Sequence, residues 1–554
     1  MAGKRIALFA GQADESYQSR FITGFLGSAF KSGYDVCIFS MYLKYQDTPE
    51  REQGESNIFS LMSPDRFDAA VILKDSIQTE NAAKELELRL KENFDKPVLV
   101  IENDSEFFPS IFTESYSSVF ALVTHLIRDH NFKDIAFLSG KKHHKHSIER
   151  LNAYRDAMTA AGLEVKEDRI IHGDFWYRSG EMCADELLSF GKKLPDAVAC
   201  ANDQMAIGLC KAFSERGIKV PDDIAVVGYD STYEGRTSPR PITSAMIPAE
   251  KFGKYAFTYL FGLINGKNDT EPFVAAPELV IGESCGCKSN ICYRTNVPLR
   301  GEWGTDISEE RYSSIFNTID ENLLSQNTLE DYLSTVYSYV YQITGAKEFH
   351  LCLSGEWKGM GLGVHIRNKG YSQKMLHAIR YYDEDRKNNI VSTDNLFDTA
   401  EMLPELYDSR EKNTAYFFTP LFFEDECFGY ASVSYGDALR SYDDTYRRWI
   451  GSVSRGLEFL RREINMQQLQ EQLDRLRSSK FSVSDRAYEN LNQEEKSQYH
   501  LVTKILDENL LDYYFQPIVS AVDGSVYAYE ALMRSRTDSK VPPLNIIKYA
   551  AMQD

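Results

Sequence analysis

Residues 195–209 read PDAVACANDQMAIGL, a short apolar run that ends on an asparagine and an aspartate before a helix-like stretch. The run 196–201 is apolar almost throughout rather than alternating, which is typical of a parallel strand covered on both faces. Similar runs occur at RIALFA (5–10), YDVCIFS (34–40), DAAVIL (68–73), PVLVIE (97–102), DIAFLSG (134–140) and DIAVVGYD (223–230). Stretches with apolar residues at helical spacing separate them. This βα alternation over residues 1–290 predicts a doubly wound α/β domain with two lobes around a cleft.

Candidate ligand residues follow these strands, because ligands of such folds lie at the carboxyl ends of the strands. Asn202 and Asp203 follow 196–201, and Asp230 ends the run 223–230. Arg150 is expected to open the helix after the loop KKHHKHS, and Phe175 lies in HGDFWYRSG. Carboxylates and a guanidinium form charge-assisted hydrogen bonds to hydroxyls, and an aromatic face covers the apolar side of a ring. This set predicts a site for a polyhydroxyl, sugar-like ligand.

Three runs carry a resemblance to the sugar-sensing domain of the lactose-repressor family: ERLNAYRDAM (149–158), PDAVACANDQMAIGL (195–209) and GIKVPDDIAVVGYD (217–230). The resemblance covers roughly the first half of the chain, and it implies ligand contacts for the five residues just named. The chain departs from the family in FTESYSS (112–118), where Glu114 and Ser115 replace the usual Asp-Asn pair. The family's DNA-reading helix-turn-helix precedes the first strand, where this chain has only residues 1–3, so we expect no DNA binding.

For two groups of residues, a structural role is the alternative to binding a ligand or a metal ion. Asp203 is also suited to cap a helix, since Asp is common at N-caps. Three histidines, His143, His144 and His146, are expected to lie in a solvated basic loop, because no thiol or carboxylate stands at a matching metal-ligand spacing.

A cysteine cluster lies in ESCGCKSNIC, at Cys285, Cys287 and Cys292. Three thiols without a clear fourth ligand leave a metal role open.

Composition narrows the class of protein. Lys and Arg number 62 and Asp and Glu 82, so the net charge of −20 argues against a broad nucleic-acid-binding surface. No apolar run approaches the roughly 20 residues of a membrane span, and no signal peptide is visible. The nine cysteines are an odd number spread over a long chain, which fits reduced thiols. These features predict a cytoplasmic protein without a membrane partner.

A second unit is predicted over residues 305–462. A helical start (307–324) precedes EFHLCLSG (348–355), and YFFTPLFFEDECFGYASVSYG (416–436) gives two β-rich runs around an acidic turn. A helix then begins near Ser441. This order resembles a GAF-type sensory domain, and the alternative is a connecting domain with no ligand of its own.

The helix that leaves this unit carries an apolar stripe. Residues at 3-4-3-4 spacing are Ile450, Val453, Leu457, Leu460 and Ile464, and the spacing resumes in a shifted phase at Met466, Leu469, Leu473 and Leu476. With its charged flanks the stripe predicts a parallel coiled coil over 463–480 that pairs two copies in a homodimer. An amphipathic helix packed on its own domain is the alternative.

The chain ends near a second informative stretch, FQPIVSAVDGSVYAYEALMRS (515–535). FQPIV and SVYAYEAL are predicted strands, joined through the strong turn signal Asp523-Gly524. Glu530 shares a strand face with apolar residues, which is costly for a carboxylate unless it is paired or binds a metal. Gln516 and Arg534 stand nearby as an amide and a fork-shaped phosphate donor.

This stretch, with PLNIIKYA after it, resembles the EAL family of cyclic-di-GMP phosphodiesterases. The resemblance implies that Glu530 is a catalytic ligand of Mg²⁺ or Mn²⁺ and that Gln516 and Arg534 contact cyclic-di-GMP. It covers residues 498–554 only, whereas the family fold is a TIM-type barrel of about 250 residues. We therefore expect the first strands of a truncated, catalytically incomplete EAL domain.

The predicted function is a cytoplasmic sensor that couples a sugar-like ligand to cyclic-di-GMP hydrolysis. The alternative is a non-catalytic sugar-binding regulator.

Overall fold

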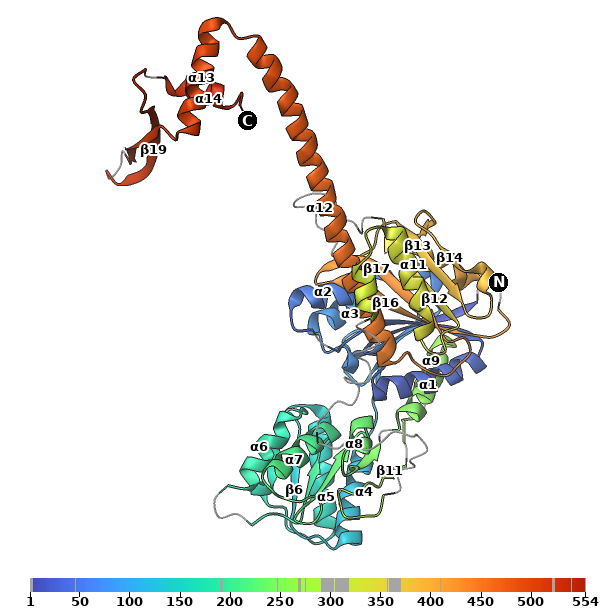
Figure 1. Ribbon diagram of the computed structural model, residues 1–554. Coiled ribbons are helices and arrows are strands. Elements are labelled where there is room, and N and C mark those ends of the chain that lie inside the picture. Colours follow the sequence, from blue (N-terminus) through green and yellow to red (C-terminus); the bar gives the residue numbers. More distant parts are fainter. Residues whose placement is uncertain are drawn as a thin grey trace. The chain divides into compact units, whose positions relative to one another are not determined.

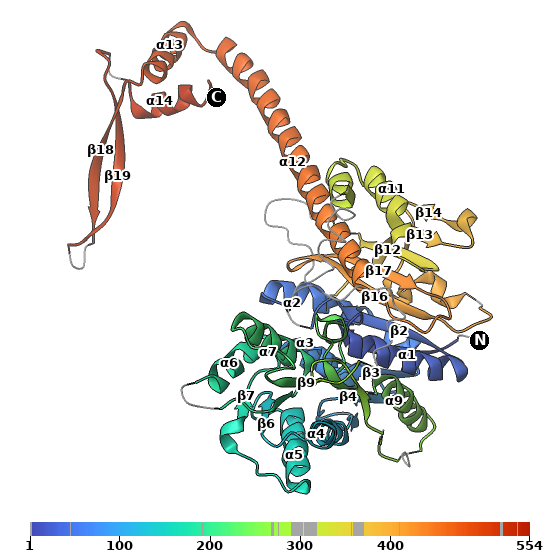
Figure 2. The same ribbon diagram turned by 60° about the horizontal axis from the view of Figure 1, so that its bottom comes forward.

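The computed structural model describes residues 3–44, 46–189, 193–246, 248–267, 271–274, 276–289, 303, 318–355, 357, 370–408, 410–520, 524–539 and 541–553, except for the side chains of 80 and 476–487. Its contacts define two compact units, Met1–Arg461 and Arg462–Asp554, which are treated separately below (Figures 1 and 2). Within these ranges, none of the helices has the length and apolar character that a membrane span requires.

The first lobe of unit 1 is built on a parallel sheet with the strand order β2-β1-β3-β4-β5. Its strands are β1 (Lys4–Gly11), β2 (Tyr34–Met41), β3 (Ala69–Leu73), β4 (Val98–Ile101) and β5 (Ser110–Ile111). Its helices are α1 (Ser16–Lys31), α2 (Pro49–Ser56), α3 (Glu80–Asn93) and α9 (Ala249–Ile264). Gly24 and Gly253 bring the backbones of α1 and α9 together, because a Cβ on Gly24 would lie 1.9 Å from the carbonyl oxygen of Glu250.

The second lobe has the strand order β11-β10-β9-β8-β6-β7, in which only β11 runs antiparallel to its neighbour. Its strands are β6 (Ile135–Ser139), β7 (Ile170–His172), β8 (Ala197–Cys200), β9 (Ala225–Tyr229), β10 (Thr243–Met246) and β11 (Glu278–Val280). Its helices are α4 (Tyr116–His130), α5 (Lys145–Ala160), α6 (Arg178–Leu187), α7 (Asp203–Glu215) and α8 (Tyr233–Thr237). Every strand predicted for residues 1–290 is present, and the two-lobed doubly wound fold is confirmed.

The rest of unit 1 is an antiparallel sheet of order β14-β13-β12-β17-β16, with β15 paired to β13. Its elements are α11 (Leu329–Tyr339), β12 (Glu348–Ser354), β13 (Lys374–Tyr382), β14 (Ile390–Val391), β15 (Leu396–Asp398), β16 (Ala415–Phe423), β17 (Glu426–Ser434) and α12 (Asp444–Glu489). The predicted order of helix, strand hairpin and exit helix is confirmed. Of the helix predicted over 307–324, residues 307–317 lie outside the described residues. The GAF-type identity stays a prediction.

The two sheets are continuous, which the sequence does not predict. Strand β16 pairs in parallel with β2, from Ala415 opposite Val36 to Phe418 opposite Phe39, and the result is one 11-stranded sheet (Figure 2). The rings of Phe39 and Phe418 stack with their centroids 5.3 Å apart. Because β2 is the edge strand of the first lobe, this pairing satisfies backbone groups that would otherwise be exposed. Segments predicted as separate domains, 1–290 and 305–462, therefore share one compact unit.

Polar contacts reinforce this junction. The loop after β1 reaches the start of α12, where Arg447 Nε lies 2.9 Å from an oxygen of the nearly buried Asp14 carboxylate. Beside it, the Ser441 hydroxyl donates to the carbonyl of Ala13 at 2.9 Å. The exit helix is thus anchored to the first lobe as well as to its own sheet.

The first part of the predicted apolar stripe lies inside unit 1. Ile450, Val453, Leu457 and Leu460 are fully buried, so for these four residues the alternative, a helix packed on its own domain, is confirmed. The reason is that this part of α12 packs on its own domain, where Tyr332 donates its hydroxyl to the Val453 carbonyl at 2.6 Å. The later positions Met466, Leu469 and Leu473 are exposed. The coil over 463–480 stays a prediction, and Leu476 lies outside the described side chains.

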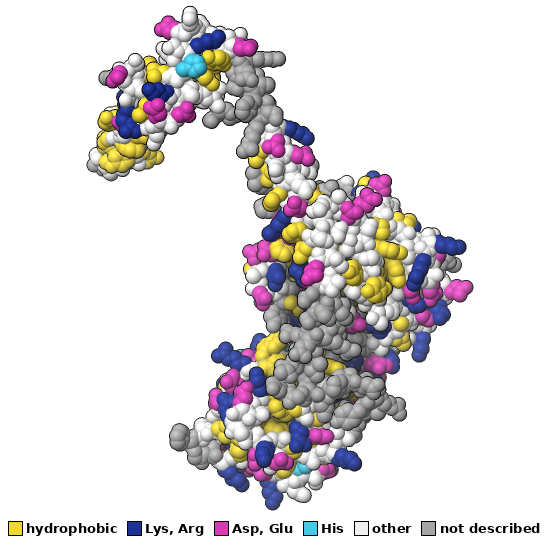
Figure 3. Space-filling view, in the orientation of Figure 1, with side chains coloured by type: hydrophobic (Ala, Val, Ile, Leu, Met, Phe, Trp, Pro, Cys, Tyr) yellow, Lys and Arg dark blue, Asp and Glu magenta, His cyan; other side chains and the backbone are white. Residues whose placement is uncertain are grey.

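Unit 2 is small. Beyond the end of α12 it contains α13 (Gln493–Asp507), the antiparallel pair β18 (Leu511–Val519) and β19 (Val526–Ser535), and α14 (Pro543–Ala550). A core of Val502, Ile505, Ile546 and Tyr549 joins α13 to α14. Both predicted strands are confirmed, and Gly524 has the positive φ of 72° that a tight hairpin favours, while Asp523 lies outside the described residues. Both faces of the hairpin carry exposed hydrophobic side chains, such as Tyr527 at 85% exposure and Val526 at 51%. Figure 3 shows hydrophobic side chains gathered on the visible side of the hairpin.

A first prediction concerns the junction. We expect Asp14→Ala to lower the free energy of unfolding of unit 1 by about 3 kcal/mol, because it leaves the mostly buried Arg447 without its carboxylate partner. Urea denaturation measures the loss. The matched control is Asp320→Ala, which removes a more exposed ion pair to Arg455 on the same helix and should cost at most about 1 kcal/mol. Equal losses in the two variants would contradict the assignment.

Candidate ligand-binding site

The predicted ligand residues gather where the second lobe meets the first. The backbone carbonyl of Asp230, after β9, accepts from Arg20 Nη2 of α1 at 3.2 Å. His146 of α5 places Nε2 3.6 Å from a carboxylate oxygen of Glu102, which follows β4. We call this region, bounded by Tyr17, Arg20 and Glu102 from the first lobe and by His146, Arg150, Phe175, Tyr229 and Asp230 from the second, the interlobe site.

Arg150 is held at the centre of the second-lobe side. Helix α5 begins at Lys145, so the prediction that Arg150 opens this helix is wrong, because the end of the histidine-rich loop is itself helical. The guanidinium carbon lies 3.9 Å from the Tyr229 ring centroid, and Nη1 donates to the Ala201 carbonyl at 2.6 Å. The side chain is only 7% exposed, and its Nε has no partner among the described residues. This N–H is available to a ligand.

Asp230 is the acceptor that faces this cation. Its backbone has a positive φ of 103°, which is unusual for a residue with a side chain, and the residue is half-buried. Burial raises the pKa of Asp230 to about 6, although the nearby Arg150 and Lys44 lower it. Within the described part of the chain its carboxylate accepts no hydrogen bond. Asp230 therefore offers unpaired acceptor oxygens beside an unpaired donor.

Asp203 lies behind the site rather than in it. It is 0% exposed, and its two oxygens accept from the backbone N–H of Thr232 and the hydroxyl of Ser244, each at 2.7 Å. Burial, followed by the nearby Asp230, raises the pKa of Asp203 to about 7. In this structure Asp203 positions the loop that carries Asp230, and the ligand contact implied by the resemblance stays a prediction.

Asn202, and not Asp203, takes the helix-capping position. Its Oδ1 accepts from the N–H of Met205 at 3.0 Å, at the start of α7, and its Nδ2 donates to the Phe175 carbonyl at 2.9 Å. Phe175 has a φ of 75°, and its ring lies against Gly140, where a Cβ would come within 2.1 Å of it. The Phe175 ring also meets His144 edge-on with centroids 5.3 Å apart. Asn202 thus helps to set the position of the aromatic ring.

Sequence reasoning missed the first-lobe residues. Glu102 accepts from the Tyr17 hydroxyl at 3.0 Å and from the N–H of Thr113 at 3.1 Å, and burial raises its pKa. It ends the predicted run PVLVIE, so the strand-end rule could have found it. The prediction of a solvated histidine loop is wrong for His146, which lies half-buried beside two carboxylates, Glu102 and Glu149. His143 is exposed as predicted.

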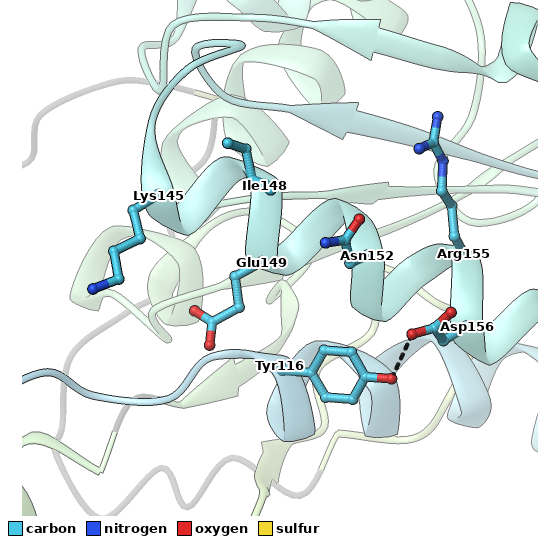
Figure 4. Close-up of a pocket in the computed structure, with 7 residues that line it drawn as sticks. All are labelled: Tyr116, Lys145, Ile148, Glu149, Asn152, Arg155 and Asp156. Atoms are coloured by element: carbon cyan, nitrogen blue, oxygen red, sulfur yellow. Dashed lines mark hydrogen bonds between the residues drawn. The ribbon is translucent and has the colours of Figure 1, made fainter.

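A separate groove of about 510 Å³ lies along α4 and α5 (Figure 4). The residues that line it are Tyr116, Lys145, Ile148, Glu149, Asn152, Arg155 and Asp156. Tyr116 donates its hydroxyl to Asp156 at 2.7 Å across this groove. None of the five predicted ligand residues lines it, so it is distinct from the interlobe site.

The second predicted site lies on the hairpin of unit 2. Gln516 is directly opposite Glu530 in the strand register, and Asp512 is opposite Arg534. Glu530 is exposed, so the predicted desolvation by apolar neighbours is wrong, because neither face of this hairpin is covered by other described residues of unit 2. Mg²⁺ takes about six oxygen ligands in near-ideal octahedral geometry. One exposed carboxylate and one amide do not meet that requirement by themselves.

The first half of the chain is similar to known proteins. Residues 123–285 match the family model of a periplasmic binding protein-like domain. The HTH-type transcriptional repressor PurR of Vibrio campbellii is 28% identical over 284 residues, which is 50% of this chain and 80% of that protein. The PurR of Histophilus somni is 29% identical over 51% of this chain and 81% of that protein.

The chain also resembles solved structures, at lower sequence identity. A LacI family transcriptional regulator from Mycobacterium smegmatis is 21% identical over 50% of this chain and 98% of that chain, with a TM-score of 0.41. The regulator CcpA of Lactococcus lactis is 20% identical over 51% of this chain and 99% of that chain, with a TM-score of 0.41. The class of protein that the match indicates is one with a periplasmic binding protein-like domain, which agrees with the two-lobed fold. More specifically, the first half of the chain is similar to HTH-type transcriptional repressors named PurR.

A second prediction follows from Asp203. Its folded-state pKa of about 7 exceeds the ordinary value of about 4, so its contribution to stability is present below about pH 4 and is lost as the pH rises through 7. We expect the free energy of unfolding of the wild type, measured relative to Asp203→Asn, to fall by about 1 kcal/mol or more between pH 5 and pH 8. Urea denaturation at a series of pH values gives this difference. Asp223→Asn, at an exposed turn, is the control and should show no such trend.

Proposed function

We propose that this protein is a ligand-responsive regulator whose interlobe site binds a small polar ligand of the sugar or nucleoside class. The observation that carries the proposal is the pair of unused polar groups, the Nε–H of Arg150 and the carboxylate of Asp230, placed beside aromatic rings. The relatives are named as HTH-type transcriptional repressors, which supports a regulatory role. The net charge of −20 disfavours a broad phosphate-binding surface, so we propose an output other than DNA binding.

The chemistry of the site favours a ligand with several hydroxyls and one flat face. Buried carboxylates with raised pKa values, Glu102 and Asp230, are strong acceptors for hydroxyl donors. Arg150 supplies a donor fixed by stacking, and Phe175 supplies an aromatic face. A purely apolar ligand would leave these groups desolvated and unpaired, which costs free energy.

The proposed signal passes through the junction with the first lobe. The loop after β1 contributes Glu15, which pairs with Lys44 near Asp230, and Asp14, which binds Arg447 at the start of α12. Ligand that reorders this loop therefore acts on the exit helix directly. We further propose that the exposed stripe of Met466, Leu469 and Leu473 pairs with a second copy, so that the signal changes the coil of a homodimer.

A third prediction tests the ligand site. In a thermal-shift panel of sugars, nucleosides and nucleobases, at least one compound should stabilise the wild type by RT ln(1 + [L]/Kd), about 2.7 kcal/mol at 100 times Kd. Arg150→Ala and Asp230→Ala should lose that shift, because each removes one of the unused polar groups. Arg155→Ala is the matched control, since Arg155 lies on the same helix and pairs at the surface with Glu167. No shift with any compound, or an unchanged shift in Arg150→Ala, would refute the assignment.

A second candidate function concerns unit 2. We propose that residues 498–554 are the start of an EAL-type cyclic-di-GMP phosphodiesterase domain, in which Glu530 is a ligand of Mg²⁺ or Mn²⁺ and Gln516 and Arg534 contact the dinucleotide. The register that sets Gln516 opposite Glu530 favours this proposal, because it places an amide beside the proposed metal ligand. The hairpin alone lacks the remaining ligands, so no catalytic step is assigned to it.

A fourth prediction tests this candidate. The 554-residue chain should not hydrolyse cyclic-di-GMP with Mn²⁺ present, because a single carboxylate cannot hold the ion. A form of the protein in which a complete barrel follows residues 498–554 should hydrolyse it, and Glu530→Ala should abolish that turnover. Glu508→Ala, at an exposed position just after α13, is the control and should retain it. Chromatography of the linear dinucleotide product measures the reaction. Turnover by the 554-residue chain, or by the Glu530→Ala form of the longer protein, would contradict the proposal.

A further inference from the structure

Two histidines and two cysteines converge at one end of the second lobe. His125 and His130 lie in the last turns of α4, and Cys285 and Cys287 lie in the segment after β11. His125 Nε2 is 3.7 Å from the sulfur of Cys285 and 3.7 Å from that of Cys287, and His130 Nε2 is 3.3 Å from the sulfur of Cys287. All four potential ligand atoms lie within 4.8 Å of one another. Helix α4 therefore supplies two nitrogen ligands beside the two thiols, which makes four potential ligands in all.

These distances have the size that tetrahedral zinc requires. Bonds of about 2.3 Å to sulfur and about 2.0 Å to nitrogen at tetrahedral angles place N and S about 3.5 Å apart. The measured N···S separations of 3.3 and 3.7 Å bracket that value. Cys285 is buried and Cys287 half-buried, and both thiols are free of disulfide bonds. A set of two imidazoles and two thiolates is a standard structural zinc site.

The local structure holds the two cysteines in place. Gly286, between them, has a φ of 96°, a conformation that favours glycine, and it turns the short Cys-Gly-Cys segment toward His130. Ser284 accepts from the N–H of Thr243 at 2.9 Å and donates to the carbonyl of Val226, so the preceding residue is tied to both β10 and β9. The segment is therefore fixed against the sheet before any metal binds.

The histidine side is oriented as well. Asp129 places a carboxylate oxygen 2.6 Å from Nδ1 of His125, which leaves Nε2 directed at the two sulfurs. A carboxylate on the far nitrogen of a ligating histidine fixes its tautomer and strengthens it as a ligand. The His130 ring stacks on Phe132 with centroids 5.1 Å apart, which restricts its rotation.

The other cluster with a metal-like composition is less suited. His350 of β12, His377 of β13 and Glu405, which lies in a helical turn between β15 and β16, are all buried. However, His350 Nδ1 lies 3.1 Å from His377 Nε2, which makes them partners of each other, and Arg380 lies 3.4 Å from Glu405. A guanidinium already neutralises the only carboxylate of that cluster, so a divalent cation there would face an adjacent positive charge.

We propose that His125, His130, Cys285 and Cys287 bind one structural Zn²⁺ ion. Four protein ligands close the coordination sphere, which is the arrangement of a structural rather than a catalytic site. The ion joins α4 to the segment after β11, and so it fixes the end of the second lobe. Cys292, the third cysteine of the motif, lies outside the described residues.

The test is metal analysis of the whole chain purified without chelators. We expect about one zinc per chain by inductively coupled plasma mass spectrometry. His130→Gln should bind zinc at least tenfold more weakly, because it removes one ligand, and the double variant Cys285→Ala/Cys287→Ala should contain none. Cys183→Ala, at another buried free cysteine of the same lobe, and Cys292→Ala should keep the full content. His377→Gln should also keep it, since the rival cluster is not the site.

Cobalt spectroscopy keeps the proposal testable if the cysteine variants fail to fold. Wild-type protein reconstituted with Co²⁺ should show the intense visible bands of tetrahedral cobalt and the ultraviolet thiolate-to-cobalt charge-transfer band, and His130→Gln should alter both. Chelation of zinc should lower the melting temperature of the wild type but not that of the double variant. A zinc-free wild type without cobalt bands, or zinc that is lost in His377→Gln and kept in the double variant, would overturn the proposal.

Discussion

The pairing of β16 with β2 is the constraint on which unit 1 depends. The edge strand of a parallel sheet normally leaves one row of backbone groups exposed to water. Here the edge strand β2 pairs instead with β16 of the antiparallel sheet, in a parallel register from Val36 to Phe39. The buried pair of Asp14 and Arg447 then ties the loop after β1 to α12. Backbone hydrogen bonds therefore join the first lobe and the antiparallel sheet into one continuous sheet. As a consequence, the exit helix is anchored to the first lobe without an intervening linker.

The interlobe site contains charged groups whose capacity for hydrogen bonding is not fully used within the protein. Burial raises the pKa values of Glu102, Asp203 and Asp230, and the guanidinium groups of Arg150 and Arg20 lie close to Asp230. Each carboxylate with a raised pKa makes the folded protein less stable as the pH rises. A ligand that donates hydroxyls to these oxygens would recover that free energy, so the same groups that weaken the fold favour binding. Positive φ angles at Glu102, Phe175 and Asp230 mark the same region as backbone held in uncommon conformations.

The sequence predicts the strands well because buried parallel strands are continuous apolar runs, and it places Arg150 and Asp230 in one region because strand ends converge. It does not predict that the Asp203 carboxylate turns inward to Thr232 and Ser244, since capping, ligand binding and internal bonding all use the same residue type. The meeting of His125 with Cys285 is equally hidden, because 160 residues separate them and only the fold brings α4 beside the segment after β11. The hydrophobic pattern of β2 does not indicate that this edge strand pairs with β16.

The apolar stripe of α12 shows what the spacing of apolar residues can predict and what it cannot. Apolar residues spaced by three and four positions lie on one face of a helix. The spacing does not indicate whether that face packs on its own domain or on a second copy. Exposure separates the two cases, because Leu457 and Leu460 are buried whereas Met466 and Leu473 are not. The stripe changes phase between Ile464 and Met466, close to the boundary of unit 1 at Arg461. A change of phase rotates the apolar face around the helix, so the face that packs on unit 1 and the face beyond it are different surfaces. The sequence therefore contains two successive apolar faces on one helix, and the phase change lies close to the point where the face that packs on unit 1 ends.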